Sequence, residues 1–111
     1  MSNPNYDESI NKFRDLVLER FKRYCEAHRF THLSNTQFVI ENGRRYDKIV
    51  EVEDPRHPTN RRVHSFIERE TGNILMPATY KAPAKHARGN IFTAPEEAFS
   101  DRYTYSIRYL K

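Results

Sequence analysis

Apolar residues recur at steps of three and four along the N-terminal part of the chain. The residues with this spacing are Tyr6, Ile10, Phe13, Val17, Phe21, Tyr24 and His28. Such spacing stacks side chains on one face of a helix. The pattern predicts an amphipathic helix with Asn3 as its N-cap and Pro4 in its first turn, ending near residue 29. We expect its apolar face to pack on a sheet, because so short a chain needs that area to fold.

Farther along the chain, the pattern changes to an alternation that is typical of strands. Residues 37–41 and 44–53 flank Asn42-Gly43, a pair that favours a two-residue hairpin because both central positions need positive φ. This register would place Phe38 opposite Asp47, so we expect a bulge in the hairpin. The second run has a mostly apolar side and a mostly acidic side. The mostly apolar side has Tyr46, Lys48, Val50 and Val52. The mostly acidic side has Asp47, Ile49, Glu51 and Glu53.

The remaining segments predict a second hairpin and one more strand. Two prolines make residues 54–60 an exposed basic loop, and residues 61–69 and 73–76 form strands around a turn in which Gly72 adopts the left-handed conformation. Prolines and a glycine predict an irregular stretch at 77–95, followed by one helical turn at 95–99. Alternation at 103–110 predicts a final strand.

The order of these elements indicates an α+β fold. We expect a single domain over residues 1–111, with the N-terminal amphipathic helix packed on a mainly antiparallel sheet of about five strands. Hydrophobic residues make up 37% of the chain and charged residues 31%, which suits a small core under a heavily charged surface.

Cysteine use and the absence of long apolar runs favour an intracellular, reducing setting. The single cysteine, Cys25, cannot form an internal disulfide, and the segment MSNPNYDE lacks the features of a secretory signal. No segment approaches the about 18 consecutive apolar residues of a membrane-spanning helix. We therefore expect no membrane as a partner.

Positive charge is concentrated in the middle of the chain. Residues 44–95 hold ten Lys/Arg and six Asp/Glu, whereas the segments before and after are balanced at six and six and at three and three. Residues 55–67 and 71–95 contain no carboxylate at all. This distribution predicts a local positive field and an anionic partner, unless acids distant in the sequence fold back beside the bases.

Cations and flat side chains occur together in these segments, as nucleic-acid binding requires. Phe66 and Phe92 are predicted to be core residues, whereas Tyr80 lies in a polar stretch and is a candidate stacking platform. No helix-turn-helix, zinc-finger or RRM signature is present, so strong sequence specificity is not expected. The predicted nucleic-acid-binding residues are Arg56, Arg61, Arg62, His64, Tyr80, Lys81, Lys85, His86 and Arg88.

The sequence patterns that suggest metal binding or catalysis are weaker than the pattern that suggests nucleic-acid binding. Cys25, His28 and His32 have a spacing that suits zinc if the helix continues, but a fourth ligand would have to come from a distant histidine. Carboxylates on one strand side, Asp47 and Glu51 among them, are candidates for Mg²⁺, but alternating acids on a solvated strand are ordinary. We therefore predict no cofactor and no enzymatic activity.

The run RRVHSFIERETGNILMPATYKAPAKHARGN, residues 61–90, resembles a pattern of small uncharacterised bacteriophage proteins. The pattern is a strand of the type R-x-V-x-x-F-I, a Thr-Gly turn, an apolar strand and K-A-P-A-K at residues 81–85. The resemblance implies a phage origin and a role in the host cytoplasm during infection, and it supplies no catalytic residue.

Two hypotheses remain open. In the first, the protein is a non-catalytic phage accessory factor that binds DNA or RNA through its basic central residues. In the second, it is a protein-interaction module, an inhibitor of an acidic host protein or a small virion component. In that case Tyr103, Tyr105 and Tyr109 on the last strand pair with a partner or with a second copy of the chain.

Overall fold

The N-terminal apolar pattern forms helix α1, Tyr6–Ala27, in the computed structural model, which describes residues 5–27, 36–54, 56, 61–93 and 95–99. Asp7 and Glu8 lie in the first turn, where the helix dipole favours anions. The buried stripe is Tyr6, Ile10, Phe13, Val17, Phe21 and Cys25. The stripe therefore contains Cys25 where the sequence pattern predicted Tyr24, and the Tyr24 side chain is half-buried. The amphipathic helix is confirmed; Asn3, Pro4 and His28 lie outside the described residues.

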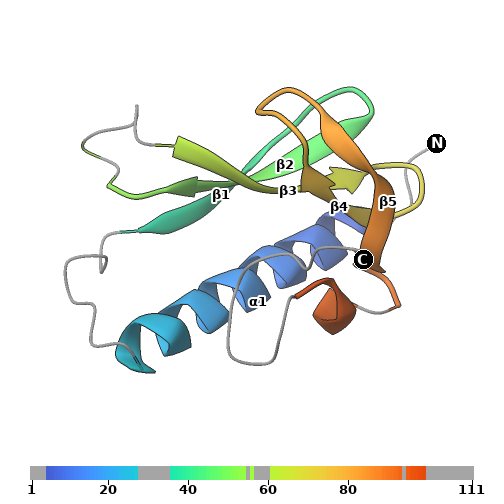
Figure 1. Ribbon diagram of the computed structural model, residues 1–111. Coiled ribbons are helices and arrows are strands. Elements are labelled where there is room, and N and C mark those ends of the chain that lie inside the picture. Colours follow the sequence, from blue (N-terminus) through green and yellow to red (C-terminus); the bar gives the residue numbers. More distant parts are fainter. Residues whose placement is uncertain (1–4, 28–35, 55, 57–60, 94, 100–111) are drawn as a thin grey trace.

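The described strands form one antiparallel sheet in chain order, β1-β2-β3-β4-β5. Their bounds are Gln37–Glu41 for β1, Tyr46–Val52 for β2, Arg61–Glu68 for β3, Asn73–Pro77 for β4 and Pro83–Asn90 for β5. Helix α1 runs along one face of this sheet, and the short 3-10 helix η1, Pro95–Ala98, lies beside α1 (Figure 1). The predicted α+β fold, a helix packed on a five-stranded antiparallel sheet, is confirmed.

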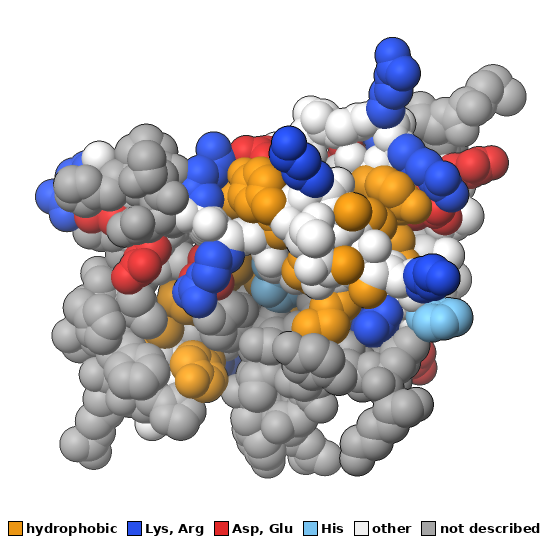
Figure 2. Space-filling view, turned by 45° about the horizontal axis from the view of Figure 1, so that its top comes forward, with side chains coloured by type: hydrophobic (Ala, Val, Ile, Leu, Met, Phe, Trp, Pro, Cys, Tyr) orange, Lys and Arg blue, Asp and Glu red, His pale blue; other side chains and the backbone are white. Residues whose placement is uncertain are grey.

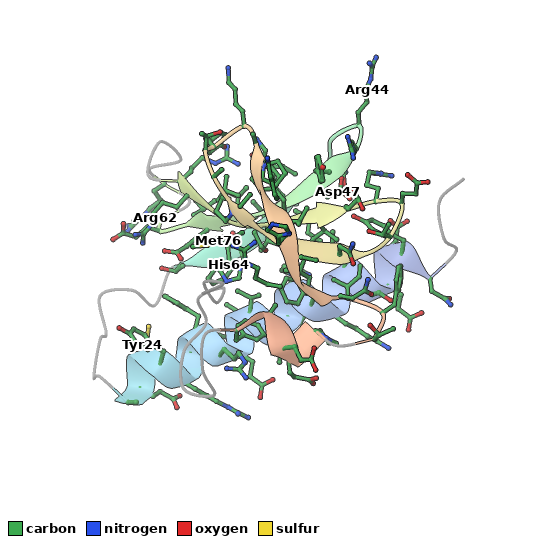
Figure 3. The ribbon with its side chains drawn as sticks, turned by 45° about the vertical axis from the view of Figure 1, so that its right-hand side comes forward. Tyr24, Arg44, Asp47, Arg62, His64 and Met76 are labelled. Carbon is green, nitrogen blue, oxygen red and sulfur yellow. The ribbon has the colours of Figure 1, made fainter. Side chains whose placement is uncertain are left out.

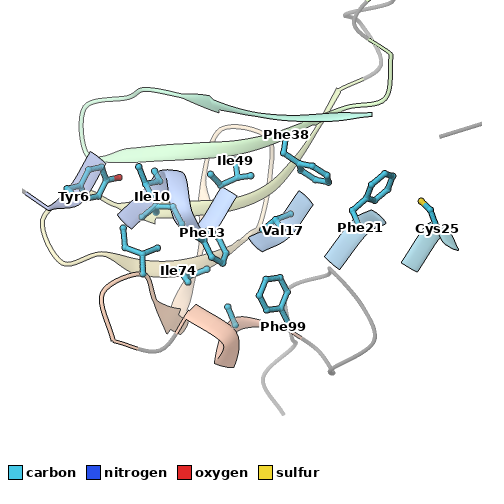
Figure 4. Packing of buried hydrophobic residues seen from close by; sticks show 13 residues of the cluster. Tyr6, Ile10, Phe13, Val17, Phe21, Cys25, Phe38, Ile49, Ile74 and Phe99 are labelled. Carbon is cyan, nitrogen blue, oxygen red and sulfur yellow. The ribbon is translucent and has the colours of Figure 1, made fainter. Parts of the chain in front are cut away.

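The hydrophobic core lies between α1 and the sheet (Figure 4). Phe13 packs against Phe99 after η1 with ring centroids 5.9 Å apart, and Phe21 meets Phe38 of β1 edge-to-face at 5.5 Å. We call this face of the sheet the inner face and the opposite face the outer face. Burial of the helix stripe is the main source of its stability, because an isolated helix of this length is marginal in water.

The first hairpin differs from the prediction in its loop and register. Glu41 pairs with Lys48, so the connection is longer than two residues, and Gly43 does not adopt positive φ. Phe38 pairs with Glu51, whereas Asp47 pairs with Ile67 on β3. The contact of Phe38 with the helix fixes this register, since a shift would remove the ring from the core.

The mostly acidic side of β2 faces the helix, because Asp47 hydrogen-bonds to Tyr6 of α1 and Ile49 belongs to the core. Local sequence assigns no partner to a buried carboxylate, which is why the alternation alone misleads here. The predicted bulge also lies elsewhere. It interrupts the pairing of β2 with β3 between Ile49 and Val50.

Residues 83–90 form the edge strand β5, although the predicted structure there was irregular. A proline at the first position of an edge strand leaves no ladder donor missing inside the sheet, so Pro83 is tolerated. The turn before β4 agrees with its prediction, since Gly72 has φ 78° and its amide donates to the Glu68 carbonyl at 2.7 Å. The predicted strand at 103–110 lies outside the described residues.

No helix among the described residues is long and apolar enough to cross a membrane.

Candidate nucleic-acid interface

Aromatic rings and cations alternate across the outer face of the sheet. The Tyr80 ring lies 4.3 Å from Lys48 Nζ, which is 5.7 Å from the Phe66 ring. Phe66 meets Tyr46 edge-to-face at 6.1 Å, and the guanidinium of Arg45 lies 5.3 Å over the Tyr46 ring. These five residues, which we call the outer ladder, connect the tip of the β4–β5 hairpin to the loop between β1 and β2.

The fold produces this ladder by curling the sheet. Tyr80 lies between β4 and β5, yet it reaches Lys48 on β2, and its hydroxyl lies 3.5 Å from Glu41 Oε1 on β1. The chain between β4 and β5 therefore arches over the outer face, as Figure 1 shows. Phe66 is 1% exposed beneath this arch, whereas Tyr80 is 45% exposed and is the exposed large aromatic of the described chain. A base can stack on the exposed Tyr80 ring without any rearrangement of the fold.

Several cations around the ladder have no carboxylate within ion-pair distance among the described residues. They are Arg44, Lys48, Lys81 and Lys85. Figure 2 shows apolar side chains along the middle of this face, with Lys and Arg side chains spaced around them. Arg44 projects from the sheet on the side opposite α1 (Figure 3). This arrangement gives the outer face an excess of positive charge.

Three of the predicted phosphate contacts are instead paired with carboxylates. Arg62 Nη2 lies 2.7 Å from Glu51 Oε2, and Arg61 pairs with Glu41. Arg56 bonds Asp54 at 3.0 Å, and these bonds raise the pKa of the Arg56 guanidinium. The predicted patch is therefore partly neutralised by acids that lie outside the acid-free segments.

Two other predicted residues lie at irregularities of the strands, which turn their side chains away from the expected direction. Ile49 pairs with Ser65 and Val50 with Val63, which leaves His64 as the extra residue. His64 faces the core, with ring centroids 6.4 Å from Phe13 and 6.0 Å from Phe38 (Figure 3).

Arg88 is the extra residue in the second irregularity, since Ile74 pairs with Gly89 and Leu75 with Ala87. It is 8% exposed, and its guanidinium donates to the His86 carbonyl. His64 and Arg88 are thus misassigned as surface contacts, because an extra residue in a strand re-aims its side chain. Of the predicted set, Tyr80, Lys81, Lys85 and His86 are exposed and have no ion pair among the described residues, whereas Arg56 and Arg62 are exposed but paired with carboxylates.

Four residues of this surface are absent from the set predicted from the sequence: Arg44, Arg45, Tyr46 and Lys48. Tyr46 and Lys48 stand on the side of β2 that has no acid, and that signal could have assigned them to the outer face together with the neighbouring loop arginines. The charge pattern alone does not indicate them, because they lie outside the segments that contain no carboxylate.

Two of the carboxylates considered for Mg²⁺, Asp47 and Glu51, already have protein partners, and that of Glu51 is Arg62 at 2.7 Å. Asp47 is 1% exposed and accepts from Tyr6 Oη at 2.8 Å, Arg69 Nη1 at 2.9 Å and the Gly43 amide at 3.0 Å. Burial, followed by the hydrogen bond and charge of Asp47, raises the pKa of Tyr6 far above its ordinary value. This cluster joins α1, the β1–β2 loop and the end of β3, which is a structural role.

The described residues contain no group of three or more His, Cys, Asp and Glu that could hold a metal ion. Burial, and then the charge of Glu51, raises the pKa of the Cys25 thiol, which disfavours a thiolate. His28 and His32 of the zinc hypothesis lie outside the described residues, as do Tyr103, Tyr105 and Tyr109.

Comparison with known proteins gives one informative result. The model of a family of unknown function (DUF7717) matches residues 5–110. No curated protein and no solved structure matches the chain. An activity therefore has to be argued from the geometry of the outer face.

Proposed function

The chain belongs to DUF7717, a family of unknown function, and we propose from its geometry that it binds nucleic acid through the outer face, without strong sequence specificity. The observation that carries the proposal is the exposed Tyr80 ring over Lys48, with further cations on the same face that have no ion pair among the described residues. The contacts are Arg44, Arg45, Lys48, Lys81 and Lys85 for phosphates and Tyr80 for a base.

The physical basis is the pairing of a diffuse electrostatic contribution with a local stacking contribution. Each phosphate that a cation neutralises releases condensed counterions, which favours binding of any sequence. An exposed tyrosine adds about 1 to 3 kcal/mol per stacked base, because every base has a flat apolar face. The outer face supplies both contributions within one contiguous surface, whereas the inner face is filled by α1.

The protein acts in this proposal as an accessory factor, and the absence of enzymatic activity stays a prediction. The phage origin and host-cytoplasmic role implied by the resemblance of residues 61–90 stay predictions.

A salt titration with labelled oligonucleotides tests the proposal. With about three to five phosphates neutralised, the logarithm of the affinity should fall with the logarithm of the salt concentration at a slope of about 2 to 5. The variant Lys81→Glu with Lys85→Glu should lose most binding while its melting temperature changes little, because exposed lysines contribute little to stability.

A matched control is Lys12→Glu with Lys22→Glu, which makes the same change in net charge on exposed positions of α1. It should retain most of the affinity. Equal losses in the two double variants would assign the binding to net charge alone. If the Lys81 and Lys85 variant binds as tightly as the parent, the outer face is not the contact surface.

A further inference from the structure

A pocket of about 370 Å³ opens on the outer face at the Arg45 end of the ladder. We propose, on the basis of the proposed function, that this pocket receives one unpaired nucleobase that carries an exocyclic amino group. Single strands are then the preferred ligand. The volume of the pocket lies in the range of about 300 to 1,000 Å³ that is usual for small-molecule sites.

The pocket combines apolar surfaces with several polar side chains. Leu75 and Ala87 form an apolar part of its wall, and the Tyr46 ring forms another. Arg45 and Lys85 also line the pocket. Leu75 and Ala87 are cross-strand partners on β4 and β5, so this part of the wall is held by the sheet itself. A flat apolar ring fits between such surfaces.

Glu68 decides between a phosphate and a base as the occupant. Its carboxylate lines the pocket, with a side chain 18% exposed, and it accepts from Thr71 Oγ1 at 2.6 Å. Arg45 Nη2 lies 3.6 Å from its second oxygen. A carboxylate repels a phosphate inside the pocket, but its remaining lone pairs can accept N–H donors. Cytosine presents such a donor at N4, and adenine presents one at N6.

The cations then hold the backbone on either side of the base. Arg45 has a side chain that is 75% exposed, and Lys85 is exposed on β5. Both can therefore reach phosphates outside the pocket while the base occupies it. Positive groups at the rim and one carboxylate inside match a nucleotide, whose charge lies on the phosphate and whose donors lie on the base.

The pocket and the Tyr80 platform lie on one continuous surface. Lys48 contacts the Tyr80 and Phe66 rings, and Phe66 contacts Tyr46, which lines the pocket. A strand that places one base on Tyr80 and another in the pocket needs both bases unstacked and free of a complementary strand, because bases within a duplex stack on their neighbours and cannot enter a pocket. The geometry therefore selects unpaired nucleic acid.

Filling the pocket tests the inference, and the control adds the same bulk nearby. Ala87→Phe fills the pocket, whereas Ala82→Phe adds a ring at an exposed position of the same hairpin that does not line it. With oligo(dC) of about 12 nucleotides, Ala87→Phe should bind about ten-fold more weakly than the parent, whereas Ala82→Phe should stay within about two-fold. The salt slope should not change in Ala87→Phe, since the phosphate contacts remain.

A second variant keeps the pocket open and removes only the charge. The parent should bind oligo(dC) and oligo(dA) several-fold more tightly than oligo(dT), and Glu68→Gln should reduce this preference. Thermal melting identifies any variant that fails to fold. If Ala87→Phe does not fold, the inference is tested by Glu68→Gln, which keeps the size of the side chain.

The outcomes separate this inference from the proposed function. If the parent binds duplex as tightly as single strands, or Ala87→Phe folds and binds as the parent does, the pocket inference is wrong while outer-face binding stands. If no oligonucleotide binds the parent at low salt, the proposed function fails and the pocket inference fails with it.

Discussion

The two faces of the sheet treat charge in opposite ways. On the inner face, Asp47 is buried, yet it receives hydrogen bonds from Tyr6, Arg69 and the Gly43 amide. On the outer face, cations such as Lys81 and Lys85 stand in solvent with no carboxylate at ion-pair distance among the described residues. Buried charge requires partners, whereas exposed charge can be left unmatched at little cost. Buried, matched charge thus holds the fold, whereas the exposed cations of the outer face, including Arg45 beside Glu68, stay accessible to a ligand.

The largest expected effect is on the inner face, at Asp47. Asp47→Asn removes the charge while keeping the size of the side chain, so Arg69 loses its ionic partner and one donor to the carboxylate loses its acceptor. We expect the free energy of unfolding to fall by about 3 kcal/mol, because breaking a buried ion pair leaves an uncompensated charge. Urea denaturation of parent and variant measures this change.

The matched control for Asp47→Asn is Glu53→Gln, since Glu53 follows β2 and is exposed. Its effect on the free energy of unfolding should stay within about 0.5 kcal/mol. A loss below about 1 kcal/mol in Asp47→Asn would mean that the hydrogen bonds of Asp47 do not hold the helix to the sheet. Paired charge on the inner face would then not be what stabilises the fold.

A pH titration sharpens the same point through Tyr6. Its pKa is raised in the folded state, so the folded protein keeps this proton at pH values where the unfolded chain, near its ordinary value of 10.0, releases it. The folded state then binds more protons than the unfolded state, and stability falls as pH rises above the unfolded pKa. For this one group the slope is about 1.4 kcal/mol per pH unit.

Tyr6→Phe removes this titration. Near neutral pH the variant should be less stable than the parent by about 1 kcal/mol, owing to the lost hydrogen bond to Asp47. Above pH 10.0 the difference should shrink and then reverse, because the parent alone carries the penalty. Urea unfolding at several pH values measures it. A difference that stays constant across this pH range would contradict the assignment of the Tyr6 hydroxyl to the buried network.

The sequence predicts those parts of the fold in which a local pattern has one solution. The helix stripe predicts α1, because apolar residues at helical spacing can be buried on one face only. A glycine at position 72 predicts the turn there, because other residues rarely adopt positive φ. The structure agrees, with a φ of 78° at Gly72. Phe66 and Phe92 were expected in the core, and Phe66 is buried while Phe92 packs against the core cluster.

The candidate site is harder to predict because it depends on pairings between distant segments. Arg61 and Arg62 lie in a segment without acids, but Glu41 and Glu51 from two other strands neutralise them. His64 and Arg88 are turned inward at irregularities that no local signal announces. Lys48 lies beside an exposed aromatic ring only because the β4–β5 arch brings Tyr80 over it. Strand register and sheet curvature, which are non-local, decided each of these positions.

On the outer face, Tyr80→Ala should separate binding from stability. Loss of one stacking platform should weaken oligonucleotide binding by about ten-fold, since base stacking contributes about 1 to 3 kcal/mol. The melting temperature should change little, because the ring is 45% exposed. Fluorescence anisotropy with a labelled single strand measures the affinity.

Tyr80→Phe is the control for the hydroxyl, which lies 3.5 Å from Glu41 and contributes little at that distance. It should bind as the parent does. If Tyr80→Phe loses as much affinity as Tyr80→Ala, the hydroxyl and not the ring makes the contact, and Tyr80 is not a stacking platform.

The smallest expected effect compares a matched cation with an unmatched one. Lys85→Gln should reduce the slope of log affinity against log salt by about one, because one phosphate contact is lost. Arg62→Gln should leave that slope unchanged, since the guanidinium already faces Glu51 at 2.7 Å. Parallel salt titrations of the two variants measure the difference. If Arg62→Gln reduces the slope as much as Lys85→Gln does, the ion pair opens when nucleic acid binds. The interface would then extend beyond the outer ladder to the arginines of β3, and even an ion pair as close as that of Arg62 would not exclude a residue from the binding surface.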